Sequence, residues 1–135
     1  MPSSESSRGS GGGADADASA DFCYLTTFGR VSGRRREIEI WFVLVDDTMY
    51  LLAGSGRQAD WVRNLDANPE CEVRIGSRKA RLLTATARLL DRGDLEGESR
   101  RARDLVYAKY QPRYEGDLGD WRERALPVAL DIQSS

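Results

Sequence analysis

The pattern of hydrophobic and polar positions predicts a β-strand at residues 22–28 and another at residues 37–45. Residues 22–28 are aromatic, apolar or β-branched and end at Gly29, which is typical of a strand followed by a turn. Residues 37–45 start with the alternation Glu-Ile-Glu-Ile and continue as an unbroken apolar run. This change predicts a single strand with one solvent-exposed face in its first half and both faces covered in its second half.

Two hairpins follow from the turn residues. Asp46 and Asp47 predict a turn from residues 37–45 into a partner strand at residues 49–53. A second hairpin is predicted between residues 72–75 and 79–90, around a Gly-Ser turn. The longer arm also has apolar spacing compatible with a helix, but its two threonines favour a strand.

Helical spacing of apolar residues appears at three places. Residues 60–67 have Trp61, Val62 and Leu65 at helical offsets before an Asn-Pro pair. Residues 95–110 present an apolar side and a charged side and are followed by Pro112, which ends a helix. A third, short helix is expected around Trp121 before a closing strand at residues 127–132.

The predicted fold class is α+β, mainly antiparallel β, with about six strands and two or three flanking helices. Consecutive strands are joined by hairpins, and the strand-helix-strand alternation of a doubly wound sheet is missing. This organisation is typical of a small barrel.

The chain divides into an N-terminal tail at residues 1–21 and one domain at residues 22–135. The tail is rich in Ser, Gly, Ala and Asp, and between Met1 and its end it has no large apolar side chain, so we expect it to be disordered. No run approaches the roughly 20 apolar residues of a membrane span, and the start lacks the pattern of a signal peptide. We therefore expect a cytoplasmic protein without a membrane span.

The composition excludes several kinds of chemistry. The 135 residues include no histidine, which removes imidazole catalysis and histidine-bound metals, and we expect no metal site. The 20 basic residues are balanced by 22 acidic ones, so a protein that tracks the phosphates of a nucleic acid is not expected. Cys23 and Cys71 lie apart within apolar runs and are expected to be buried thiols.

The segment 29–36 is the first candidate binding site. It has two glycines, Ser32 and four arginines, Arg30, Arg34, Arg35 and Arg36. Guanidinium groups bind phosphate or carboxylate oxygens in pairs, which favours an anion site. A solvated, arginine-rich hairpin tip is an equally good interpretation of the residues alone.

The second candidate site is the turn Gly54-Ser55-Gly56-Arg57 ahead of the helix at residues 60–67. A glycine-rich turn that opens a helix presents free N–H groups to an anion, although the same glycines suit an ordinary connection. Trp61 and Asn64 share one face of that helix. We expect Trp61 to contribute to packing, and Asn64 either caps the chain or binds a ligand.

Two motifs together resemble a known family. Residues 25–33 read Leu-Thr-Thr-Phe-Gly-Arg-Val-Ser-Gly, and residues 61–69 read Trp-Val-Arg-Asn-Leu-Asp-Ala-Asn-Pro. Their sequence, order and spacing are similar to those of the deazaflavin-dependent nitroreductase and quinone reductase family. Val31 departs from the Lys or Arg frequent in that family.

The resemblance implies a split β-barrel that binds the deazaflavin coenzyme F420. It also implies an oxidoreductase that transfers a hydride to an electron-poor small molecule, such as a quinone, an enone or a nitro compound. The residues expected to bind the cofactor are Arg30, Ser32, Arg35, Arg36, Gly54, Ser55, Gly56, Arg57, Trp61 and Asn64. Two tyrosines, Tyr107 and Tyr110, are the candidate catalytic proton donors, with water as the alternative.

Other interpretations stay open at this point. The same barrel could bind FMN by its single phosphate, or the protein could be a non-catalytic binder of a flavin-like or other anionic ligand. The oligomeric state is also open. The apolar residues Trp41 to Val45 suit either the core of one chain or the interface of a homodimer.

Overall fold

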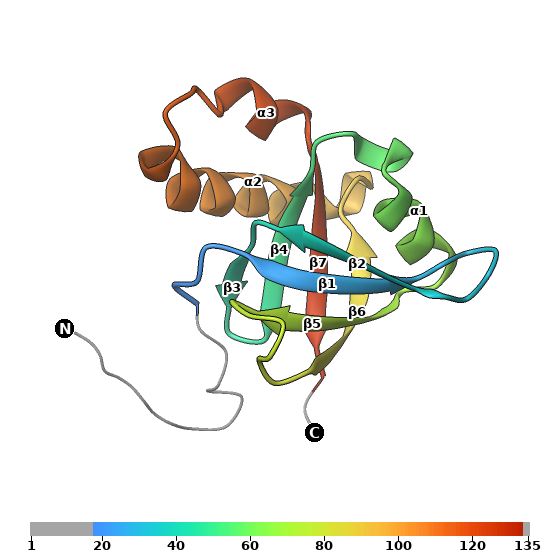
Figure 1. Cartoon of the computed structure of the whole chain (residues 1–135). Helices are drawn as coiled ribbons and strands as arrows, with labels where there is room; N and C mark the ends of the chain where they lie inside the picture. The colour runs from blue at the N-terminus through green and yellow to red at the C-terminus, as the bar shows by residue number, and fades with distance from the viewer. Residues whose placement is uncertain (1–17, 134–135) are drawn as a thin grey trace.

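A computed structural model describes residues 18–133, which form one seven-stranded antiparallel sheet with three α-helices (Figure 1). The order of the strands across the sheet is β2-β1-β5-β6-β7-β4-β3. The strands are β1 (Cys23–Phe28), β2 (Arg35–Ile40), β3 (Val43–Val45), β4 (Thr48–Ala53), β5 (Glu70–Ile75), β6 (Leu83–Leu89) and β7 (Leu126–Ile132). The helices are α1 (Asp60–Ala67), α2 (Glu96–Tyr110) and α3 (Gly119–Arg124), with short 3₁₀ helices at Gly56–Gln58, Gly93–Leu95 and Gln111–Arg113.

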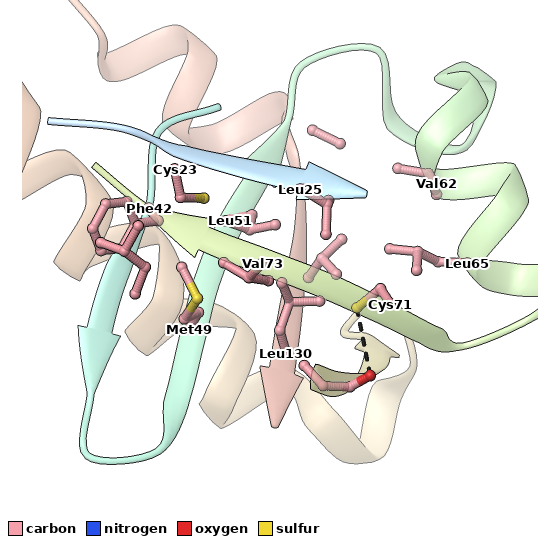
Figure 2. Close-up of a cluster of buried hydrophobic side chains, with 14 of the residues drawn as sticks. Cys23, Leu25, Phe42, Met49, Leu51, Val62, Leu65, Cys71, Val73 and Leu130 are labelled. Carbon is pink, nitrogen blue, oxygen red and sulfur yellow. Dashed lines mark hydrogen bonds between the residues drawn. The ribbon is translucent and has the colours of Figure 1, made fainter. Parts of the chain in front are cut away.

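The sheet curls so that its two halves face each other across the main core. In Figure 1, β1, β2 and β5 run across β4 and β7 at a steep angle. Figure 2 shows Leu25 and Val73 from one half pointing toward Leu51 and Leu130 of the other, and all four side chains are fully buried. Burial of each such side chain contributes about 1.5–3 kcal/mol to folding. The predicted α+β split barrel is confirmed.

The long helix α2 covers the outer face of β4 and β7. It contributes Ala102, Val106 and Tyr110 to a second buried cluster, together with Tyr50 and Leu52 of β4. Strand β4 is thus covered on both faces, which explains why its residues are apolar without alternation. Helix α1 lies on the other side of the molecule, where it covers one end of the barrel with Val62 and Leu65 (Figure 2).

The prediction of one strand at residues 37–45 is wrong. The chain breaks at Trp41 and Phe42, and β2 and β3 lie at opposite edges of the sheet. The hydroxyl of Tyr110 accepts a hydrogen bond from the Phe42 N–H at 3.0 Å, and the Phe42 carbonyl accepts one from Lys109 at 2.9 Å. Side chains of α2 therefore satisfy the backbone of Phe42 where no strand is paired with it, which permits the break.

The other strand boundaries differ less from those predicted from the sequence. The long arm predicted at residues 79–90 forms a strand only at Leu83–Leu89, and β2 begins two residues earlier than expected, at Arg35. The disorder predicted for the tail concerns mostly residues outside the described range. Within that range, Ala18 and Ala20 accept hydrogen bonds from Lys109, and the Asp21 carbonyl accepts one from Tyr110, so residues 18–21 lie against α2.

Candidate functional site

The loop between β1 and β2 is a compact hairpin turn that carries the arginines. Gly29 N–H donates to the Arg34 carbonyl and Gly33 N–H to the Gly29 carbonyl, both at 2.8 Å, and Ser32 Oγ accepts from the Arg34 N–H. A Cβ atom at Gly29 would lie 2.9 Å from Ser32 Oγ, and Gly33 has a φ of 73°. The left-handed backbone of Gly33 favours glycine, and a side chain at Gly29 would displace Ser32 Oγ.

Asn64 of α1 anchors this loop to the barrel. The Asn64 Oδ1 atom accepts hydrogen bonds from the Arg30 N–H and from Arg30 Nη1, and Asn64 Nδ2 donates to Thr27 Oγ1 at 3.1 Å. Asn64 and Thr27 are 3% and 1% exposed, so the bond between their side chains is shielded from water. The structure thus gives Asn64 a positioning role that the sequence did not predict, and its contact with a ligand stays a prediction.

A cavity of about 800 Å³ opens between this loop, strand β2 and the start of α1. Its volume falls within the roughly 300–1,000 Å³ of small-molecule sites. It brings together five of the residues predicted from the sequence to lie at one site in addition to Asn64: Arg30, Ser32, Arg35, Arg36 and Trp61. Gly29 and Val31 of the predicted segment 29–36 also line the cavity, and the lining residues that the sequence did not single out are Thr27, Glu37, Ile38 and Asp60.

The three arginines of this cavity differ in their partners. Arg30 contacts Asp60 at 3.4 Å, and Arg35 forms an ion pair with Glu72. Arg36 lies opposite Thr27 in the β1–β2 register, and within residues 18–133 no carboxylate is paired with its guanidinium group. Arg36 is thus the cavity arginine best able to receive an anion.

A second, smaller cavity of about 250 Å³ lies where the end of β2 meets β4 and α3. Its lining residues are Phe22, Glu39, Ile40, Trp41, Leu52 and Trp121. The Trp41 ring is stacked on Tyr110 at 4.4 Å and meets Trp121 edge-on at 5.7 Å. The sequence did not reveal this cavity, because its residues come from segments far apart in the chain.

The glycine-rich turn 54–57 lines neither of these two cavities. The Arg57 guanidinium holds Asp91 with two hydrogen bonds and also pairs with Asp66, and the bond from Arg57 lowers the pKa of Asp91. Gly54 lies under Trp121, since a Cβ atom there would be 3.2 Å from the indole nitrogen. A role of Gly54, Ser55, Gly56 and Arg57 in cofactor binding stays a prediction.

The two candidate catalytic tyrosines lie outside both cavities. Burial raises the pKa of Tyr110 to about 12, and its hydroxyl is bonded to the backbone of Phe42 and Asp21. Tyr107 packs against α2 and α3 residues with Arg122 4.4 Å from its ring. The structure gives both tyrosines packing partners, and their proposed catalytic role stays a prediction.

Two further findings concern residues 18–133 as a whole. No helix in this part of the chain is long and apolar enough to cross a membrane. The same part contains no group of three or more cysteine or acidic side chains that could hold a metal ion.

The comparison with protein families identifies one match over nearly the whole chain. A family model described as F420H(2)-dependent quinone reductase matches residues 4–133. This range includes both the loop that follows β1 and the complete helix α1.

Solved structures share the fold at low sequence identity. An F420-H2 dependent reductase, FDR-A, is 21% identical with a TM-score of 0.60, over 84% of this chain and 94% of that one. A putative 5-nitroimidazole antibiotic resistance protein from Bacteroides thetaiotaomicron is 14% identical with a TM-score of 0.64, over 85% and 74% of the two chains. A structure described as a domain-swapped dimer is 22% identical with a TM-score of 0.62, over 84% and 80%.

Proposed function

The chain belongs to the F420H(2)-dependent quinone reductase family, and we propose that it reduces an electron-poor small molecule with a hydride from the reduced deazaflavin cofactor. A quinone, an enone or a nitro compound would be the acceptor. The observation that carries this proposal is the arginine-lined cavity beside α1, with the unpaired guanidinium of Arg36 on its wall.

The residues of this cavity fit an anionic cofactor. Arg30, Arg35 and Arg36 outnumber the lining carboxylates Glu37 and Asp60, and Glu37 is itself bonded to Arg78. We propose that Arg36 and Ser32 hold the phosphate and acidic tail of coenzyme F420, while Arg30, bonded to Asn64 and Asp60, shapes the loop beside them. Trp61 and Ile38 supply apolar wall to the same cavity, which would exclude water from part of the ligand.

The proposed reaction requires the chain to bind and orient its ligands, and it requires few catalytic side chains. The bound deazaflavin would supply the hydride, a step that needs no histidine. The protein would bind and orient the cofactor in the larger cavity. Strand β2 lines both cavities, the larger with Ile38 and the smaller with Ile40, and we place the acceptor in the smaller one because its aromatic walls suit a flat molecule.

Water is the proton source that this geometry favours. Tyr107 and Tyr110 line neither of the two cavities, and the Tyr110 hydroxyl is engaged with backbone groups. The product of hydride transfer would then take its proton from solvent that enters the open mouth of the site.

One experiment tests the cofactor and the reaction together. The purified protein is titrated with oxidised F420 and, separately, with FMN, and the reduced forms are then mixed with 1,4-naphthoquinone while cofactor oxidation is followed by absorbance. Binding of F420 with turnover supports the proposal. Binding of F420 without turnover of the quinone, an enone or a nitroarene would indicate a non-catalytic binder, and selective binding of FMN would indicate the FMN-dependent alternative.

The homodimer expected from the sequence stays a prediction. One related structure is described as a domain-swapped dimer, which is a property of that protein. Size-exclusion chromatography of this chain with light scattering distinguishes a monomer of 15.0 kDa from a dimer of twice that mass.

A further inference from the structure

The smaller cavity combines aromatic walls with one acidic side chain. Phe22, Trp41 and Trp121 supply three aromatic rings, and Glu39 is the single charged residue among the lining residues described. At about 250 Å³ the cavity is smaller than the roughly 300–1,000 Å³ of sites for drug-sized ligands, so it suits one or two fused rings.

Glu39 differs from its neighbour on β2 in having no bonded cation. Glu37 accepts a hydrogen bond from Arg78 at 2.8 Å, and Arg78 also stacks over Tyr24 at 4.6 Å. Tyr24 is directly opposite Glu39 in the register, so Arg78 lies on the same face of the sheet but is held by Glu37. For the Glu39 carboxylate, residues 18–133 provide no hydrogen bond or ion pair, and its interaction with the Arg78 charge is weaker than that of Glu37.

An unpaired carboxylate beside aromatic rings favours a positive ligand for two separate reasons. The carboxylate attracts a cation and repels an anion, and the faces of indole and phenyl rings also attract cations. Trp41 is held in place for such a contact, because Tyr110 is stacked on it with an interplanar angle of 3°.

We propose that Glu39 determines the charge preference of the acceptor cavity, which selects aromatic acceptors with a cationic substituent over anionic ones. This inference rests on the proposed function in taking the smaller cavity as the acceptor site. It concerns the specificity of the site, and it does not depend on which cofactor donates the hydride.

The first test is a binding measurement without cofactor. The chain has three tryptophans, of which Trp41 and Trp121 line the smaller cavity and Trp61 lines the larger one. In a Trp61→Phe background, quenching of the remaining tryptophan fluorescence reports ligand binding beside Trp41 and Trp121. The probes are 1,4-naphthoquinone and its derivatives with a trimethylammonium or a sulfonate group at one and the same position.

We expect the cationic derivative to bind about threefold to tenfold more tightly than the anionic one. The difference is modest because a partly exposed pair of charges interacts weakly in water. Glu39→Gln should bring the two affinities together and leave that of the neutral quinone unchanged. Glu96→Gln is the matched control, because Glu96 is an exposed residue at the start of α2, about 20 Å along the helix from Tyr110. This control should retain the preference.

Three results would overturn the inference: equal affinities in the parent protein, a preference that survives Glu39→Gln, or no quenching by any of the probes. Circular dichroism of each variant confirms that it is folded. The second test measures kcat/KM for the same compounds with reduced F420, in the protein that keeps Trp61 and in its Glu39→Gln and Glu96→Gln variants. Charge-selective binding without any turnover contradicts the proposed function alone, and turnover without charge selection contradicts the role of Glu39 alone.

Discussion

The side-chain oxygen of Asn64 accepts two hydrogen bonds from Arg30, one from its backbone N–H at 3.2 Å and one from its guanidinium at 2.9 Å. Both ends of Arg30 are therefore fixed to one buried atom of helix α1. Because Asn64 also donates to Thr27 on β1, a single amide joins the helix, the strand and the arginine loop. The loop that lines the larger cavity is thus held in shape before any ligand arrives.

Asn64→Ala should destabilise the protein by about 1–3 kcal/mol, because it leaves the buried Thr27 hydroxyl without its donor. It should also weaken cofactor binding by freeing the loop. Asn64→Asp keeps an acceptor for Arg30 and should lose less of that affinity than Asn64→Ala. Urea unfolding and cofactor titration of the two variants check this, and equal cofactor affinities in both would contradict the positioning role.

Arg36→Ala should weaken the binding of F420 by about 1.5–3 kcal/mol, roughly tenfold to a hundredfold, since a hydrogen bond to a charged group is lost. Arg34→Ala is the matched control, because Arg34 lies in the same loop and is exposed but does not line the larger cavity. Fluorescence titration with F420 measures both. If the two variants lose the same affinity, the effect is one of general charge and Arg36 has no specific contact.

Glu98 should contribute to stability at neutral pH and lose this contribution in acid. It accepts hydrogen bonds from Arg88 and Tyr50, and the bond from Arg88 is the main cause that lowers its pKa from the ordinary value of 4.5. A carboxyl with a lower pKa in the folded state stabilises above its unfolded pKa, and this stabilisation is lost as the pH falls through the folded value.

Glu98→Gln should therefore cost at most about 1 kcal/mol at neutral pH, because the group is partly exposed to solvent. As the pH is lowered below 4.5, the free energy of unfolding of the Glu98→Gln variant should fall less steeply than that of the parent protein. Urea midpoints at neutral pH and through the acid range measure the two slopes. Parallel curves would show that Glu98 has the same pKa in the folded and unfolded chain.

Cys23 and Cys71 should not react with a water-soluble thiol reagent while the protein is folded. Both are buried, and burial raises the pKa of each thiol to about 12, with Glu70 and Glu72 adding to the effect at Cys71. The reactive thiolate is therefore scarce at neutral pH. Titration with a disulfide reagent should detect no thiol in the native protein and two in denaturant. Rapid reaction of either native thiol would show that the core opens locally.

Several parts of the fold follow from short-range patterns. Helix α1 occupies Asp60–Ala67 as the spacing of Trp61, Val62 and Leu65 predicts, and the hairpin at Asp46 and Asp47 is formed. Neighbouring residues decide these elements through backbone preference and periodicity. The apolar run from Trp41 to Val45 contains no such signal of a break. The break depends on Tyr110 and Lys109, which are distant in sequence and supply hydrogen bonds to Phe42.

The sequence by itself determined that arginines, a serine and glycines gather in one turn after a strand, and that this turn and helix α1 carry the motifs of one family. Only the tertiary structure decided which arginine is available. Asp60, Glu72 and Asp91 occupy Arg30, Arg35 and Arg57, respectively, while Arg36 faces the larger cavity without a carboxylate partner among the residues described. The smaller cavity was decided in the same way, as β2, β4 and α3 bring Glu39, Leu52 and Trp121 together. The physical reason is that charge pairing and cavity walls depend on which strands and helices become neighbours, and local sequence patterns do not contain that information.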